Sequence, residues 1–228
     1  MKAVILAAGE GIRMRPLTLK VPKPLLKIAG RPIIDYTLSN MPLEIDELIV
    51  VTKHLGEQIK DFIGRQNRHM KVKYAQGSDK GTAYSFIAAK NYLKNERFLV
   101  ITGDDIPGTQ DIKNCLAKDL SILVFKPRDP RVCGMAYQRK DGSIWKIIEK
   151  PKVSKANLAI TGVMVLNTDI FNYKPVLERG EYYLSSMVGL FAKDHKVFPV
   201  MSTNFIGEIT TPQDLIRVGS ILVARHKT

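Results

Sequence analysis

Short apolar runs alternate with longer amphipathic stretches in the first half of the chain, and this alternation constrains the fold more than any other feature. The short runs are rich in β-branched residues, which is typical of buried strands. The longer stretches carry apolar side chains at helical spacing, such as Ala83, Phe86 and Ile87. We expect strands at 4–6, 48–51, 72–74 and 98–101, and helices at 33–40, 57–63 and 82–93. Regular alternation of the two predicts an α/β fold with a parallel, doubly wound sheet.

The second half of the chain has strand candidates with fewer helices between them, at 121–125, 144–148 and 159–166. We expect this half to be more antiparallel. The residues DGS at 141–143 indicate a hairpin turn between two of these runs, because an Asp-Gly pair accepts the positive φ angles of a tight turn. A final helix should begin with Thr211 as N-cap, Pro212 at its first position and Asp214 in its first turn.

The composition favours one compact protein with anionic partners. A chain of 228 residues with 45% hydrophobic content can bury one sizeable core, so we expect a single domain over residues 1–228. The formal net charge of +13 indicates anionic partners, but no basic tail or aromatic-rich RNA-binding signature points to nucleic acid. Cys115 and Cys133 lie far apart, which indicates a reducing compartment. Without a signal peptide or a bilayer-spanning run, the expected location is cytoplasmic and away from membranes.

A glycine-rich loop directly follows the first expected strand. Ligands of an open parallel sheet bind beyond the carboxyl ends of its strands, and Gly9 and Gly11 would let backbone N–H groups approach a polyphosphate closely. The loop is not a dinucleotide fingerprint, because Met14 replaces the third glycine and Arg31 the acidic residue. It is not a Walker A loop either, because that pattern requires Gly and Lys where the chain has Met14 and Arg15.

A second block places Lys23 between Pro22 and Pro24, which restricts the backbone and holds the ammonium group in a preset direction. Together with the glycine loop, this block resembles the sugar-phosphate nucleotidyltransferase (nucleotidylyl transferase) family. The resemblance covers almost the whole chain and is carried by LAAGEGIRMRPLT at 6–18, VPKPLL at 21–26 and GRPI at 30–33.

The resemblance implies a Rossmann-like nucleotidyltransferase fold, with a mixed, mostly parallel central sheet flanked by helices and a small antiparallel sugar-binding part. It further implies a nucleotide-binding half at 1–110 and a sugar-phosphate-binding half at 111–228. Because the chain ends soon after the last expected helix, we expect a short form of the family without the C-terminal left-handed β-helix. The implied cofactor is Mg²⁺.

The resemblance also assigns roles on the nucleotide side. It implies that Arg13 and Lys23 contact the phosphates as catalytic cations, which agrees with stabilisation of the charge that develops on a leaving pyrophosphate. Gln76 offers an amide to a base edge, at the start of a segment that resembles the family's base-reading segment. The implied nucleotide-binding residues are Leu6, Ala8, Gly9, Gly11, Gln76, Gly81 and Thr82.

On the metal and sugar side, the resemblance implies that Asp104 is a Mg²⁺ ligand at a strand end, since Mg²⁺ prefers hard oxygen ligands. The second family ligand is an aspartate, which Glu208 replaces here, and Thr210 replaces the usual glycine that follows. Asp105 is equally compatible with a turn or helix-cap role. The implied sugar-phosphate-binding residues are Gly134, Glu149, Lys150, Thr161 and Gly162.

The implied reaction joins a nucleoside triphosphate and a sugar 1-phosphate into an NDP-sugar and pyrophosphate, with glucose 1-phosphate and dTTP or UTP as the first expectation and mannose 1-phosphate and GTP as the second. Two alternatives stay open. One is a cytidylyltransferase for a non-sugar phosphate such as phosphocholine or inositol phosphate. The other is a non-catalytic regulatory module. Glu208 favours this alternative, whereas retention of four other residues speaks against it: Arg13, Lys23, Asp104 and Lys150. The oligomeric state is open, a homo-oligomer included.

Overall fold

The computed structural model describes residues 1–66, 69–207 and 209–225. The α-helices are α1 (Ile33–Ser39), α2 (Gly56–Gly64), α3 (Thr82–Ile87), α4 (Thr109–Leu116), α5 (Leu184–Asp194) and α6 (Pro212–Arg225). The strands of the main sheet are β1 (Lys2–Ala7), β4 (Glu47–Thr52), β5 (Lys71–Gln76), β6 (Arg97–Thr102), β7 (Ser121–Phe125), β8 (Gly134–Gln138), β9 (Ile144–Glu149), β10 (Leu158–Asn167) and β13 (Phe198–Met201). Short strands pair as β2 (Lys27–Ile28) with β3 (Arg31–Pro32), and β11 (Leu177–Glu178) with β12 (Glu181–Tyr182).

One sheet runs through both halves of the described chain, in the order β13-β7-β10-β6-β1-β4-β5. The four strands of the first half are parallel, with β1 between β4 and β6. Strand β10 runs antiparallel to both of its neighbours, β6 and β7, so β7 has the same direction as the first-half strands, and β13 is parallel to β7. The mixed, mostly parallel sheet is therefore confirmed, and the antiparallel character of the second half resides in β10 and in the β8–β9 hairpin beside it.

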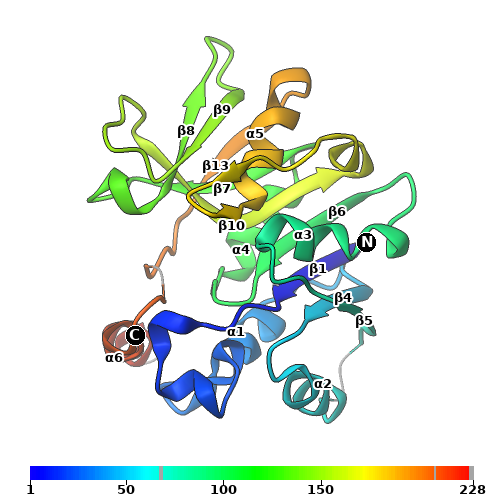
Figure 1. Ribbon diagram of the computed structural model, residues 1–228, viewed down its shortest axis with the longest axis vertical. Coiled ribbons are helices and arrows are strands. Elements are labelled where there is room, and N and C mark those ends of the chain that lie inside the picture. The colour runs from blue at the N-terminus through cyan, green and yellow to red at the C-terminus, as the bar shows by residue number, and fades with distance from the viewer. Residues whose placement is uncertain (67–68, 208, 226–228) are drawn as a thin grey trace.

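Helices cover both faces of this sheet (Figure 1). Alternate side chains of β1 point to opposite faces, which is the period-2 geometry of a strand. Val4 and Leu6 enter a core with α3 and α5, whereas Ala3 and Ile5 enter a second core with α1, α2 and α4. The strands are consequently apolar on both faces, which explains the short continuous apolar runs in the sequence.

A third core lies outside the sheet and joins the two ends of the chain. Met14, from the loop after β1, is fully buried there against Ile209 and Val218, the latter from α6. Figure 1 shows α6 next to the N-terminal segment that links β1 to α1. Burial of these apolar side chains thus holds the loop after β1 against the C-terminal helix.

The expected strands and helices are present, but one expected helix is broken and several elements were not predicted. The helix expected at 82–93 ends at Ile87 and is followed by a 3-10 turn at Lys90–Tyr92. The helices α4 and α5 and the main-sheet strands β8 and β13 were not predicted. The two strands are only five and four residues long, which gives a weak periodic signal in the sequence. The DGS turn joins β8 to β9, with Gly142 at φ +83° as a tight turn requires. Every helix in the described residues is too short or too polar to traverse a lipid bilayer.

Asp214 closes the first turn of α6. Its carboxylate accepts hydrogen bonds from the backbone N–H groups of Thr210 and Thr211 at 3.0 and 2.8 Å and from both of their hydroxyls, and it pairs with Arg217 at 2.9 Å. The hydroxyl of Thr211, the expected N-cap, therefore donates to Asp214. Partial burial alone would raise the pKa of Asp214, but the hydrogen bonds from Thr210, Arg217 and Thr211 outweigh it and hold the pKa far below its usual range.

Replacement of Phe86 tests the core around α3. Phe86 is fully buried, stacks on Phe171 at a ring-centroid distance of 5.0 Å and packs against the tilted ring of Phe98 at 6.0 Å. We expect Phe86→Ala to lower the free energy of unfolding by about 3–5 kcal/mol, because the truncation leaves a cavity. Denaturant unfolding measures this loss. Leu43→Ala, at a side chain that is 81% exposed, is the control and should change stability by less than about 0.5 kcal/mol.

The Asp214 contacts predict a pH-dependent contribution to stability. We expect Asp214→Ala to destabilise the protein by about 0.5–2 kcal/mol at pH 7, the usual cost of losing a helix cap. Because the folded-state pKa lies below the unfolded value of about 3.9, this contribution is complete above that value and is lost as the pH falls below it. Unfolding of both proteins between pH 7 and pH 3 should show the difference shrinking at the acid end. A constant difference would contradict this account.

Candidate nucleotide and sugar-phosphate site

Two adjoining pockets open at the carboxyl ends of β1 and β6, and together they form the candidate site. The first, the loop pocket, has a volume of about 440 Å³, and the second, the β10 pocket, about 230 Å³. Because β10 runs antiparallel to β6, its first residues reach the same edge of the sheet. Both pockets are lined by Arg13, Thr82, Thr102, Asp104 and Thr210.

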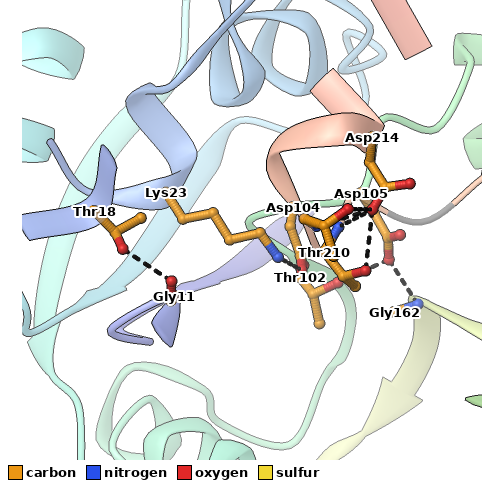
Figure 2. Close-up of polar contacts among 10 residues, drawn as sticks. Gly11, Thr18, Lys23, Thr102, Asp104, Asp105, Gly162, Thr210 and Asp214 are labelled. Carbon is orange, nitrogen blue, oxygen red and sulfur yellow. Dashed lines mark hydrogen bonds and ion pairs between the residues drawn. The ribbon is translucent and has the colours of Figure 1, made fainter. Parts of the chain in front are cut away.

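The glycine loop is held close to the chain that follows it. Gly11 has φ +62°, and a Cβ there would lie 3.0 Å from Cγ2 of Thr18 and 3.2 Å from Cβ of Lys23. The Thr18 hydroxyl donates to the Gly11 carbonyl at 2.9 Å (Figure 2), and Met14 N–H donates to the same oxygen at 2.8 Å. A larger residue at position 11 would therefore be strained and crowded, so the loop conformation requires glycine here.

An ion pair joins the two predicted phosphate and metal residues. Lys23 Nζ lies 2.5 Å from Oδ2 of Asp104, and only 13% of the lysine side chain is exposed (Figure 2). Burial disfavours the ionised form of Asp104, but the Lys23 ammonium beside it, together with hydrogen bonds, holds the pKa of Asp104 below its ordinary value. Asp104 is thus a carboxylate at neutral pH, which is the state a metal ligand needs.

The far wall of the β10 pocket carries a second pair of opposite charges. Glu149 Oε2 accepts the Ser185 hydroxyl at 2.8 Å, and its Oε1 lies 3.6 Å from Lys150 Nζ. The Lys150 ammonium also lies over the ring of Tyr183, 5.2 Å from its centroid. Lys150 adopts φ +44°, and its carbonyl oxygen accepts a hydrogen bond from Arg179. Glu149 and Tyr183 therefore hold the Lys150 ammonium at the pocket wall, while Arg179 fixes the Lys150 backbone.

The structure brings most of the sequence-predicted residues together. The loop pocket contains Leu6, Ala8, Gly9, Gly11, Arg13, Lys23, Gly81, Thr82 and Asp104. The β10 pocket contains Arg13, Thr82, Asp104, Gly134, Glu149, Lys150, Thr161 and Gly162. Gln76 is exposed at the end of β5 and lines neither pocket, so its contact with a base stays a prediction. Glu208 lies outside the described residues.

The pockets also contain residues that sequence reasoning missed. Glu181 lines the loop pocket, and Tyr183 and Ser185 line the β10 pocket. Glu181 belongs to β12, Tyr183 follows it, and Ser185 lies in the first turn of α5. This stretch lies beside α3, since Thr82 Oγ1 accepts the Leu184 N–H at 2.9 Å. A turn signal in the sequence at Arg179-Gly180 marks this segment, but nothing in the sequence places it at the site.

The donor set at Asp104 fits a divalent cation in part. The Lys23 ammonium already pairs with the carboxylate, so this position attracts positive charge. Mg²⁺ needs only one or two protein carboxylates when substrate phosphates and water complete its shell. Among the described residues, no group of three or more His, Cys, Asp or Glu side chains forms a site that the protein could complete by itself.

Comparison with solved structures supports the fold. The crystal structure of an apo UDP-glucose pyrophosphorylase superposes with a TM-score of 0.80, covering 99% of this chain and 98% of the other at 19% sequence identity. At this identity, the likeness shows the Rossmann-like fold of a nucleotidyltransferase and no more.

Comparison of sequences supports the family. The bifunctional protein GlmU of Methanocaldococcus jannaschii is 30% identical over 232 residues, which cover 100% of this chain and 56% of that protein. A bifunctional sugar-1-phosphate nucleotidylyltransferase/acetyltransferase of Sulfurisphaera tokodaii is 30% identical over 224 residues, or 96% of this chain and 54% of that one. The chain thus spans about half the length of these relatives. The family described as nucleotidyl transferase matches residues 2–205, nearly the whole chain, and we conclude that the protein belongs to the nucleotidyl transferase family.

Proposed function

We propose that this protein transfers a nucleotidyl group from a nucleoside triphosphate to a sugar 1-phosphate, forming an NDP-sugar and releasing pyrophosphate. The observation that carries the proposal is the junction of the two pockets, which share Arg13 and Asp104. A triphosphate in the loop pocket and a sugar phosphate in the β10 pocket would meet there. Such an arrangement turns a bimolecular reaction into one between two positioned groups.

In this proposal the loop pocket holds the nucleotide. Backbone N–H groups around Gly9 and Gly11 and the Arg13 guanidinium bind the triphosphate. The close packing of Gly11 holds the loop in place for this contact. Lys23 supplies an ammonium group, and the prolines on either side restrict its backbone. The leaving pyrophosphate gains negative charge, and each preorganised donor beside it lowers the barrier by roughly 2–4 kcal/mol.

The β10 pocket holds the sugar phosphate. Lys150 neutralises the phosphate, and Glu149 accepts hydrogen bonds from sugar hydroxyls while Ser185 keeps its carboxylate in place. Gly134 faces Glu149 across the β8–β9 pair, and a Cβ at this position would lie 3.0 Å from Glu149 Oε2. The absence of a side chain at Gly134 therefore leaves this wall open to the sugar.

The chemical step is an in-line attack of a sugar 1-phosphate oxygen on the α-phosphorus. A phosphate monoester with a second pKa of about 6 is already largely a dianion at neutral pH, so the step needs no general base. Catalysis then consists of positioning and charge neutralisation. This explains a site made of Lys, Arg, carboxylates and glycines.

Nucleotidyltransferases of this family generally use a divalent metal, and we propose Mg²⁺ here. Asp104 would hold the ion, with Glu208 as the predicted second ligand. When bound, the ion neutralises phosphate oxygens and polarises the α-phosphorus. The Lys23 ammonium, which lies beside Asp104, would neutralise phosphate charge as a second cation.

For the substrates, we propose glucose 1-phosphate with dTTP or UTP first, and mannose 1-phosphate with GTP second. The Sulfurisphaera tokodaii relative, named as a sugar-1-phosphate nucleotidylyltransferase, supports a sugar phosphate rather than phosphocholine or inositol phosphate. Cys115 and Cys133 are both buried thiols, which supports a reducing, cytoplasmic location.

Pyrophosphate release tests the proposed reaction. We expect release only when Mg²⁺, a nucleoside triphosphate and a sugar 1-phosphate are all present, and its loss on addition of EDTA. Asp104→Ala should lower kcat by about 10²–10³-fold or more, because it removes the carboxylate at the pocket junction. Asp119→Ala, at a side chain that is 83% exposed, is the matched control and should keep full activity.

A substrate panel identifies the two substrates by pyrophosphate release. It should combine four nucleoside triphosphates with glucose, mannose and N-acetylglucosamine 1-phosphates, phosphocholine and inositol phosphate. Turnover only with a non-sugar phosphate would contradict a sugar 1-phosphate as the substrate. No turnover with any pair would favour a non-catalytic module.

Lys150 and Lys152 allow a sharper test of the sugar-phosphate pocket. Lys150 lines the pocket, whereas Lys152 is exposed two residues away and does not. Lys150→Ala should raise the KM for the sugar phosphate about 10- to 100-fold, since it removes a charge-assisted contact, with little change in the KM for the nucleotide. Lys152→Ala should change neither constant. Equal effects of the two substitutions would show that only the overall positive charge matters.

A further inference from the structure

Strand β10 is irregular where it passes the site. Its register with β7 shifts between Ile160 and Met164, and its pairing with β6 begins only at Met164. Thr161 and Gly162 lie in this interval and line the β10 pocket. We call residues 161–162 the β10 bend. The backbone of the bend is not held by the ladder with β6, so other groups must fix its position.

The Asp105 carboxylate supplies that contact. Its Oδ2 accepts the Gly162 N–H at 2.7 Å, and it also accepts the Thr102 hydroxyl at 2.7 Å (Figure 2). Thr102 is the last residue of β6, so a single carboxylate oxygen ties the β10 bend to the carboxyl end of β6. Hydrogen bonds to an ionised acceptor are stronger than those between neutral groups.

The backbone of Asp105 is itself anchored on two sides. Its N–H donates to the Thr102 carbonyl at 3.1 Å, and its carbonyl accepts the buried Thr37 hydroxyl of α1 at 2.7 Å. Asp105 is therefore a junction of α1, β6 and β10, one residue after Asp104. A shift of the carboxylate would move the bend relative to Asp104.

Gly162 makes the close approach possible. A Cβ at this position would lie 2.0 Å from Oγ1 of Thr102 and 2.5 Å from Oδ2 of Asp105. No side chain fits in that space, so a larger residue would push the bend away from the carboxylate. The contact thus depends on residues from two distant parts of the chain.

We propose that Asp105 is a positioning residue that sets the sugar side of the site. Its carboxylate holds the β10 bend, and with it Thr161 and Gly162, at a defined distance from Asp104 and the nucleotide pocket. The inference rests on the proposed function for the identity of the ligand in the β10 pocket. It gives Asp105 a role distinct from that of Asp104, although the two are adjacent.

Steady-state kinetics test this role with two substitutions of Asp105. Asp105→Ala removes the acceptor, and we expect the KM for the sugar 1-phosphate to rise about tenfold while the KM for the nucleotide changes less than about twofold. Asp105→Asn keeps an acceptor oxygen and should restore most of the wild-type KM. Asp119→Ala serves as the exposed control. A KM that rises equally for both substrates would overturn the proposal, as would a raised Mg²⁺ requirement in Asp105→Asn, which would make Asp105 a metal ligand.

Amide hydrogen exchange provides a readout that does not depend on turnover. The Gly162 amide should exchange at least tenfold faster in Asp105→Ala than in wild type or Asp105→Asn, while the Leu166 amide in the β6–β10 ladder is unchanged. Equal protection of Gly162 in all three proteins would overturn the proposal.

If Asp105→Ala does not fold, Gly162→Ala tests the same contact from the other side and should raise the same KM. If the wild type shows no turnover, the proposed function fails, and Gly162 exchange still decides whether Asp105 holds the bend.

Discussion

The parallel pairing of β1 with β6 is the constraint on which the site depends. The register places Leu6 opposite Thr102, so the glycine loop and the Gly103-Asp104 turn leave the sheet side by side. Gly103 N–H donates to the Leu6 carbonyl at 2.8 Å, and a Cβ at Gly103 would lie 2.9 Å from that oxygen. This close packing carries the glycine loop and the proposed metal ligand Asp104 to one edge, where Lys23 reaches Asp104.

Strand β10 adds the second pocket to the same edge. A parallel strand would have its carboxyl end at this edge. Because β10 is antiparallel, its first residues lie there instead, and the chain enters β10 from the β8–β9 hairpin. The hairpin supplies Gly134 and Glu149, which pair directly across its two strands. The reversal of one strand thus places the β10 pocket beside the loop pocket.

Charge in the site is balanced before any ligand binds. Lys23 lies against Asp104, and Lys150 against Glu149, so each cation has a carboxylate partner. These pairs keep the side chains ordered in partly buried positions, where an unpaired charge is costly. Anionic substrates and a divalent ion would exchange these partners rather than meet bare charges. The net charge of +13 is therefore a poor guide to the site, where both signs occur.

Sequence reasoning predicted the strands of the first half and most pocket residues, because local signals suffice there. Apolar runs mark strands that are buried on both faces, and Gly11, Lys23 and Asp104 stand in short motifs directly after expected strands or in the loop that follows. Reasoning of this kind failed for β8 and for the segment with Glu181, Tyr183 and Ser185. The segment with Glu181, Tyr183 and Ser185 reaches the site through contacts with distant parts of the chain. Leu184 bonds to Thr82 of α3, 102 residues away, and Ser185 bonds to Glu149 of β9, 36 residues away.

The amino-acid sequence by itself determined the α/β class, the family and most of the residues that line the two pockets, because periodicity and motif spacing are local properties. Only the tertiary structure decided that β10 is reversed, that the two pockets meet at Arg13 and Asp104, and that Asp105 holds Gly162. These facts depend on which distant segments pack together. Strand direction and long-range hydrogen bonds arise from burial of the whole sheet, and no short stretch of sequence encodes them.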